Sequence, residues 1–157
     1  MNIDKISRLT SGFTGADLEN LVNLASVNAS KKNKDKIDMG DMDYAFDRVV
    51  IGLENQSLNS ILSESEKLKT AIHECGHAII RYLQNEKALH KLTIIPRGKT
   101  LGVAYYIPSE SSEYIGNKET YLQQIDQALG GMVAEEVFYG KEKTTSGGKN
   151  KSKNFFF

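Results

Sequence analysis

The sequence contains little cysteine, proline or tryptophan, and it has no excess of either charge. Its 157 residues include one Cys, two Pro and no Trp, and 20 basic residues balance 20 acidic ones. A single cysteine, Cys75, cannot form an intramolecular disulfide, so nothing requires an oxidising compartment. The zero net charge argues against a broad nucleic-acid-binding surface, because such surfaces need clustered Lys and Arg. We therefore expect no nucleic-acid partner.

Long apolar runs are also missing. No uninterrupted apolar stretch approaches the roughly 20 residues that cross a bilayer, and residues 1–5 (MNIDK) are unlike a signal peptide. We therefore expect the chain by itself to be soluble. The scarcity of proline and the long stretches rich in Leu, Ala, Lys and Glu predict a mainly helical protein of one or two small domains.

Two helices are predicted in the first third of the chain. Thr14 and Asp17 form a capping-box pattern, and apolar residues recur at helical spacing from Leu18. The charged stretch 31–36 ends this helix and predicts a solvated turn rather than a phosphate-binding patch. A second, shorter helix is predicted over residues 42–50.

The rest of the sequence predicts a long helix, a β-hairpin and another long helix. Residues 52–63 have no periodic apolar stripe and are the expected linker. Ser63 and Glu66 form a second capping box, which begins a helix of about five turns. β-branched and aromatic runs on either side of residues 96–98 predict the hairpin, and the helical period then returns until Gly140, the expected C-cap. The expected fold is α+β and mainly helical.

Residues 73–77, H-E-C-G-H, form an H-E-x-x-H motif inside the first long helix. His73 and His77 lie on one helix face, so both imidazoles can reach one cation, and the spacing is typical of zinc. Glu74 would be the general base that activates a zinc-bound water. The alternative is a core helix that carries two histidines by chance. We favour zinc, because the chain has only three histidines and Gly76 occupies mid-helix despite a cost of about 1 kcal/mol.

Other residues near the motif leave alternatives open. Glu135 or Glu136 could supply a third zinc ligand, could support a ligand from behind, or could form a partly solvated acidic pair, the option that we favour. We expect His90 to have a surface role. We interpret Cys75 as a small buried residue rather than a ligand or nucleophile.

Several segments resemble FtsH-type AAA+ zinc metalloproteases, over about residues 5 to 150. Residues 70–78 resemble that family's active-site helix, A-Y-H-E-A-G-H-A, residues 91–98 its K-V-T-I-I-P-R-G, residues 101–102 its L-G, residues 130–136 its G-G-R-x-A-E-E, and residues 12–18 the G-F-S-G-A-D-L of its AAA+ lid. An ordered series of this kind is far more specific than H-E-x-x-H alone.

The resemblance implies a zinc metalloendopeptidase that degrades unfolded or membrane proteins. The full-length family uses ATP and forms homo- or hetero-hexamers anchored in a bacterial inner, mitochondrial inner or plastid membrane. For this chain it implies an AAA+ lid fragment over 1–51, a linker over 52–63, a C-terminally truncated peptidase domain over 64–150 and an unmatched tail over 151–157. The sequence has no G-x-x-x-x-G-K-[ST] phosphate loop, so we expect no ATP hydrolysis by the chain alone.

The resemblance also assigns roles to residues. It gives zinc binding to His73 and His77 and the base to Glu74. It places Gly15 and Ala16 near nucleotide, although starting a helix is their plainer role.

The family's third ligand, an Asp in T-G-A-S-N-D, aligns with Lys151, which cannot bind zinc. We therefore expect this ligand to be lost or replaced. The alternative function is a catalytically inactive fragment that interacts with full-length relatives.

The predicted hairpin has two possible roles. Residues 97–98 and 101–106 could bind substrate as an added strand on an exposed sheet edge, as in many zinc proteases. The hairpin could equally pack on the active-site helix without binding substrate.

Overall fold

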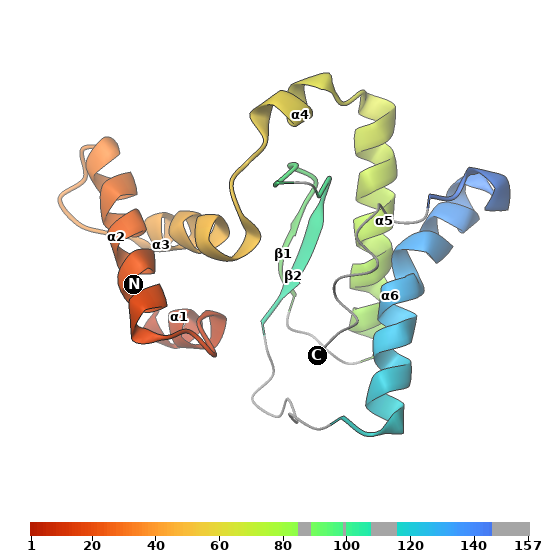
Figure 1. The fold of residues 1–157 in the computed structure, drawn as a ribbon, viewed down its shortest axis with the longest axis horizontal. Coiled ribbons are helices and arrows are strands. Elements are labelled where there is room, and N and C mark those ends of the chain that lie inside the picture. Colours follow the sequence, from red (N-terminus) through yellow and green to blue (C-terminus); the bar gives the residue numbers. More distant parts are fainter. Residues whose placement is uncertain (85–88, 99, 108–115, 146–157) are drawn as a thin grey trace. The chain divides into compact units, whose positions relative to one another are not determined.

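The structure is a computed structural model and describes residues 1–84, 89–98, 100–107 and 116–145. These residues are mainly helical and include a two-stranded antiparallel sheet, which confirms the expected α+β class (Figure 1). The chain divides into two compact units, Met1–Glu54 and Asn55–Phe157. Within the described ranges, no helix combines the length and apolar character needed to cross a membrane.

The first unit consists of three helices and a π-helical turn. They are α1 (Ile3–Leu9), α2 (Gly15–Lys31), α3 (Met39–Phe46) and η1 (Asp47–Ile51). The capping box of Thr14 and Asp17 is present at the start of α2, as predicted. A second box, formed by Asp38 and Asp41, begins α3. No helix was predicted from the sequence where α1 lies.

A small core and the buried carboxylate of Asp41 hold this unit together. The core consists of apolar side chains from all three helices: Leu9, Leu21, Ala25, Ala29, Met42, Ala45 and Phe46. The Asp41 carboxylate is fully buried and accepts hydrogen bonds from Asn28 (2.9 Å) and Lys34 (3.0 Å). Lys34 belongs to the charged stretch that was expected to be merely solvated. It instead connects the turn to the start of α3.

The second unit contains the predicted long helices and hairpin. Its elements are α4 (Gln56–Ile61), α5 (Glu64–Leu83), β1 (Leu89–Thr93), β2 (Val103–Tyr106), α6 (Lys118–Tyr139) and the 3₁₀ turn η2 (Lys141–Lys143). The capping box of Ser63 and Glu66 begins α5, and Gly140, with φ of 82°, ends α6 as predicted. The short helix α4 lies inside the segment expected to be a linker.

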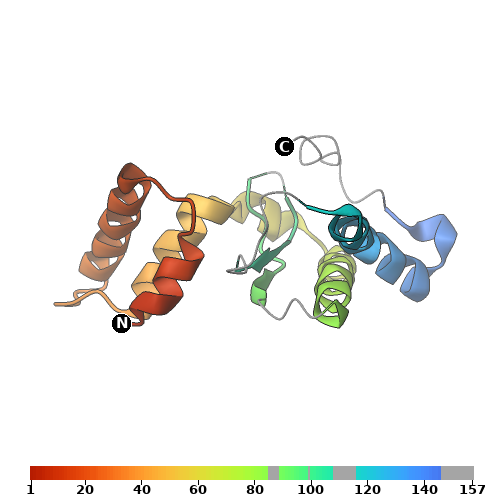
Figure 2. The same cartoon turned by 90° about the horizontal axis from the view of Figure 1, so that it is seen from below.

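Helix α5 lies between the hairpin and α6, and this order is visible in both views (Figures 1 and 2). Two glycines permit α5 and α6 to pack closely. A Cβ on Gly76 would lie 2.3 Å from the Gly130 carbonyl oxygen, and one on Gly130 would lie 2.8 Å from the Gly76 carbonyl oxygen. The two backbones are therefore closer than any larger residue would allow. This close approach brings α6 to the motif on α5.

Candidate metal centre

Two histidines of α5 bring their Nε2 atoms close together. The Nε2 atoms of His73 and His77 are 3.1 Å apart, and the rings meet edge to face. Two bonds of about 2.0–2.1 Å to one tetrahedral zinc ion would separate the nitrogens by roughly 3.3 Å. The observed distance between the two Nε2 atoms is therefore close to the one that a shared zinc ion requires.

Each imidazole is oriented by an acceptor on α6. His73 Nδ1 lies 2.6 Å from Glu135 Oε1, and His77 Nδ1 lies 2.7 Å from the Gln127 carbonyl oxygen. A carboxylate and a carbonyl only accept, so both Nδ1 atoms carry the proton. In the neutral imidazoles both Nε2 atoms then present lone pairs to each other, an arrangement that a cation between them would stabilise.

The carboxylate of Glu135 is buried, with 1% of the residue exposed, whereas Glu136 is exposed. The expectation of a partly solvated acidic pair is therefore wrong for Glu135. Burial alone would raise its pKa, but hydrogen bonds from the Thr145 N–H, the Thr145 hydroxyl and His73 lower the pKa below the ordinary value. Glu135 contacts the Nδ1 side of His73, opposite the converging Nε2 atoms. It supports that imidazole from behind rather than joining it as a ligand.

Glu74 lies where α5 meets the hairpin. Burial raises the pKa of its carboxyl group, against smaller lowering effects of His73 and of a hydrogen bond from the Ala104 N–H. Gly102 makes room for this contact, because a Cβ there would lie 2.8 Å from Glu74 Cγ. The hairpin thus packs on the helix that carries the motif and fixes the carboxylate expected to act as the base.

His90 and Cys75 are the other two residues considered near the motif. His90, in β1, is partly buried and its ring meets Tyr105 edge to face at 6.0 Å. Cys75 is exposed, so its expected burial is wrong. Its neighbour Gly76 faces α6, and consecutive helix residues point about 100° apart, which turns Cys75 away from the packed face.

The described residues provide no third protein ligand at the histidine pair. No group of three or more His, Cys, Asp or Glu side chains in those ranges is arranged to hold a metal ion. Lys151, the position aligned with the family's Asp, lies outside the described residues. Gly15 and Ala16 are exposed in the first turn of α2.

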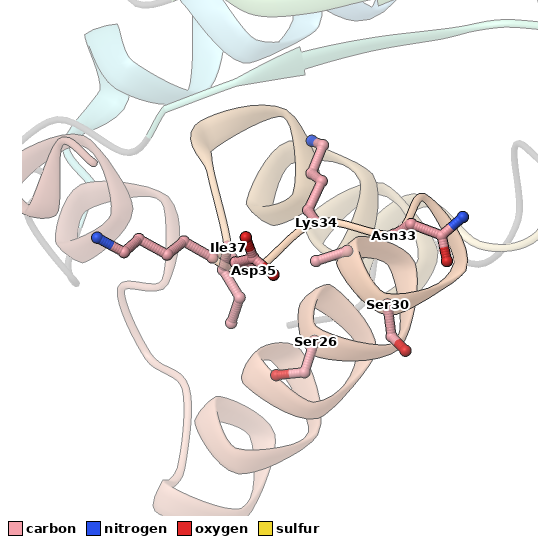
Figure 3. Close-up of a pocket in the computed structure, with 8 residues that line it drawn as sticks. Ser26, Ser30, Asn33, Lys34, Asp35 and Ile37 are labelled. Carbon is pink, nitrogen blue, oxygen red and sulfur yellow. The ribbon is translucent and has the colours of Figure 1, made fainter.

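The first unit contains a hollow of about 550 Å³ at the turn between α2 and α3 (Figure 3). Its lining includes Ser26, Ser30, Asn33, Lys34, Asp35, Lys36 and Ile37. The Lys34 ammonium is already bonded to two aspartates, Asp38 and Asp41. The residues that line this hollow therefore do not form a candidate catalytic site comparable to the one on α5.

Comparison with known proteins agrees with this arrangement. Residues 60–154, more than half of the chain, match peptidase family M41, and residues 1–44 match the AAA+ lid domain. The chain belongs to peptidase family M41. The family resemblance inferred from the separate segments is confirmed, and the M41 match contains the H-E-x-x-H helix, the hairpin and α6.

Similar M41 proteins come from bacteria and a eukaryote. The chain is 42% identical over 151 residues to the ATP-dependent zinc metalloprotease FtsH of Aquifex aeolicus, covering 96% of this chain and 23% of that protein. It is 44% identical over 142 residues to FtsH of Myxococcus xanthus, covering 90% and 22%. It is 40% identical over 151 residues to the YME1 homolog of Schizosaccharomyces pombe, covering 96% and 21%. The chain thus spans less than a quarter of these relatives.

The surroundings of the histidine pair include residues of α6 whose roles were not predicted from the sequence. Gln127 and Gly131 were not considered for the site, and Glu135 was assigned to the surface. A Cβ on Gly131 would lie 2.5 Å from His73 Nε2, so this glycine packs directly on the imidazole. The available signal was the mid-helix Gly130-Gly131 pair followed four residues later by Glu135, which places close packing and a carboxylate on one helix face.

Proposed function

We propose that residues 55–145 provide the zinc-peptidase site of an ATP-dependent protease of the FtsH type. His73 and His77 would bind zinc, and Glu74 would be the general base. The observation that carries the proposal is the convergence of two Nε2 atoms 3.1 Å apart, each imidazole being oriented through its Nδ1. Such a pair is a ready ligand set for zinc, which neutral imidazoles bind well.

The residues around the pair suit peptide hydrolysis. Zinc, when bound, supplies a Lewis acid that lowers the pKa of water to about 7. Glu74 would accept the proton of the attacking water and return it to the leaving amine. Its burial raises its pKa, which brings the carboxyl closer to the pH at which it must both take and release a proton. The Ala104 N–H holds the carboxylate in place beside α5.

The hairpin supports a further part of the proposal, the binding of substrate as an extended strand. Ala104 pairs with Leu92 in the β1–β2 ladder, yet its N–H is directed to Glu74. This edge of β2 therefore lies next to the proposed base. A peptide added along it would have its backbone close to the reacting groups.

The activity of the whole protein belongs to the proposal as well. The lid match over residues 1–44 and the names of the relatives, ATP-dependent zinc metalloproteases, support ATP-dependent proteolysis. We propose that the whole protein acts on unfolded or membrane proteins as a membrane-anchored hexamer. ATP would be bound by parts of such a protein that include a phosphate loop.

The substitution Glu74→Gln tests the site. The amide keeps the shape of the side chain but cannot act as a base, so we expect cleavage of casein to fall about 100-fold or more while bound zinc is retained. The control is Glu64→Gln in the first, exposed turn of the same helix, which should change neither property. Inhibition by o-phenanthroline should confirm that cleavage depends on metal.

Two results would contradict the proposal. Undiminished cleavage by Glu74→Gln would remove this residue from the mechanism. A wild-type chain that binds no zinc and cleaves nothing would instead favour the inactive-fragment interpretation.

A further inference from the structure

We propose that Glu135 is a positioning residue that couples the orientation of His73 to the docking of residues 141–145. Metal binding and the docking of this segment would then stabilise each other. The inference rests on the proposed function for the identity of the metal. It concerns a carboxylate that contacts no substrate and acts only through the imidazole in front of it.

The contacts of Glu135 join two parts of the chain that are far apart in sequence. Oε1 accepts from His73 Nδ1 at 2.6 Å and from the Thr145 hydroxyl at 2.8 Å. Oε2 accepts from the Thr145 N–H at 2.7 Å and lies 3.6 Å from Lys69 Nζ. Lys69 Nζ also donates to the Lys143 carbonyl oxygen. We call Lys69, Glu135 and Thr145, together with the Lys143 carbonyl, the carboxylate clamp.

The clamp is rigid because its central charge is buried. Only 1% of Glu135 is exposed, so water cannot replace a lost donor without rearrangement. Each donor restricts the carboxylate plane, and the plane fixes the direction of the hydrogen bond to His73. If residues 141–145 move away, Glu135 loses two hydrogen-bond donors, the N–H and the hydroxyl of Thr145. The carboxylate is then free to turn toward Lys69 and away from the imidazole.

The tautomer of His73 depends on its hydrogen bond to Glu135. A carboxylate on Nδ1 keeps the proton there and leaves Nε2 as an acceptor facing His77. Loss of the contact allows the proton to move to Nε2, where it would block a cation. Coupling of this kind is reciprocal, so a cation at Nε2 also favours the docked position of Thr145.

Histidine tautomers in the metal-free chain provide the first test. Nitrogen-15 NMR should find the Nδ1–H form of His73 in the wild type and a mixture of forms in Glu135→Gln. The amide has only one accepting oxygen and cannot serve His73 and Thr145 as the carboxylate does. His77 is the internal control, because the Gln127 carbonyl holds it in every variant. Glu136→Gln, at the neighbouring exposed acid, is the matched control.

Zinc affinity, measured by competition with a chelator, provides the second test. We expect Glu135→Gln to weaken binding about 10- to 100-fold, Thr145→Val to weaken it less, and Thr145→Ser to restore it. The double variant Glu135→Gln/Thr145→Val should bind zinc no more weakly than Glu135→Gln alone, because both changes act through one carboxylate. Zinc should also slow amide exchange at Thr145. Each of these variants should keep the wild-type helix content.

The outcomes separate the clamp from the zinc proposal. An unchanged His73 tautomer in Glu135→Gln would overturn the clamp even if zinc binds. A shifted tautomer without any zinc binding by the wild type would support the clamp and contradict the proposed function. Additive losses of affinity in the double variant would show that Thr145 acts independently of Glu135, and would overturn the coupling.

Discussion

His73 and His77 are oriented less by their own helix than by the one beside it. Their Nδ1 atoms donate to groups on α6, which lie 62 and 50 positions further along the chain. Gly131, between those groups, lets α6 approach the His73 ring. The smallest side chain in the sequence is therefore as important for the geometry of the pair as the larger polar ones.

Substitution Gly131→Ala should damage the metal site more than the fold. The new Cβ would meet His73 Nε2 at 2.5 Å, so the imidazole must turn out of its hydrogen bond. We expect zinc affinity to fall about 10- to 100-fold and the free energy of unfolding to fall by about 1–3 kcal/mol. Zinc titration and thermal melting of the metal-free chain measure the two effects.

The control for this variant is Gly15→Ala at the start of α2. Nothing lies within 4 Å of a Cβ at that position, and its φ is not positive. Both zinc affinity and stability should stay close to wild type. Wild-type zinc affinity in Gly131→Ala would show that His73 is not the ligand that the geometry implies.

The sequence predicted only part of the site at this scale. The pairing of His73 and His77 follows from helix geometry, because four residues make slightly more than one turn. The support by Glu135 depends on contacts across 62 residues, and no local pattern contains them. The burial of Cys75 was mispredicted because its apolar character says nothing about which helix face finds a partner.

At the scale of elements, the helix caps were the features predicted most reliably from the sequence. The capping boxes at Thr14 and Ser63 and the glycine C-cap at 140 all occur as predicted, because each is a contact within a few residues. Helices α1 and α4, of 7 and 6 residues, were not predicted. Neither is long enough to show a repeated apolar period.

The cap of α3 predicts how the first unit responds to acid. A hydrogen bond from Lys34 is the largest cause that lowers the pKa of Asp38, to about 2 from the ordinary value of 3.8. A lowered folded-state pKa gives stability that is complete above about pH 4 and is lost as pH falls toward 2. We therefore expect the helical circular dichroism signal of the chain to become less resistant to heat across that window.

Asp38→Asn should flatten this pH dependence. Asparagine caps a helix as well as aspartate does but cannot form the ion pair with Lys34. Asp35→Asn removes a neighbouring acid from the same turn and should keep the wild-type slope. An unchanged slope in Asp38→Asn would show that other carboxylates control the acid transition.

At the scale of the whole molecule, helical periodicity overestimated burial. Leu68, Ile79 and Leu83 recur at helical spacing within α5, a pattern that favours a buried helix face, yet their exposed fractions are 58%, 57% and 69%. The pattern predicted a helix correctly, but it did not predict which of its residues meet α6. Packing of α5 on α6 depends instead on Gly76 and Gly130, which a hydrophobic pattern does not contain.

The division into two compact units leads to the last prediction, that zinc protects one unit selectively. A ligand that binds only the folded state stabilises it by RT ln(1 + [L]/Kd), about 2.7 kcal/mol at 100 times Kd. The histidine pair and its acceptors all belong to Asn55–Phe157. We therefore expect zinc to slow amide exchange in α5 and α6 by up to about 100-fold and to leave α2 unchanged.

Hydrogen exchange of the full chain, resolved by segment, measures this difference, and His77→Ala is the matched variant. It removes one of the two nitrogens, so zinc should no longer protect α5, whereas His90→Ala should behave as wild type. Protection of α2 equal to that of α5 would mean that the units unfold together, since a site confined to one unit stabilises only what unfolds with it. Protection retained in His77→Ala would place the zinc elsewhere in the chain and would contradict the proposed metal centre.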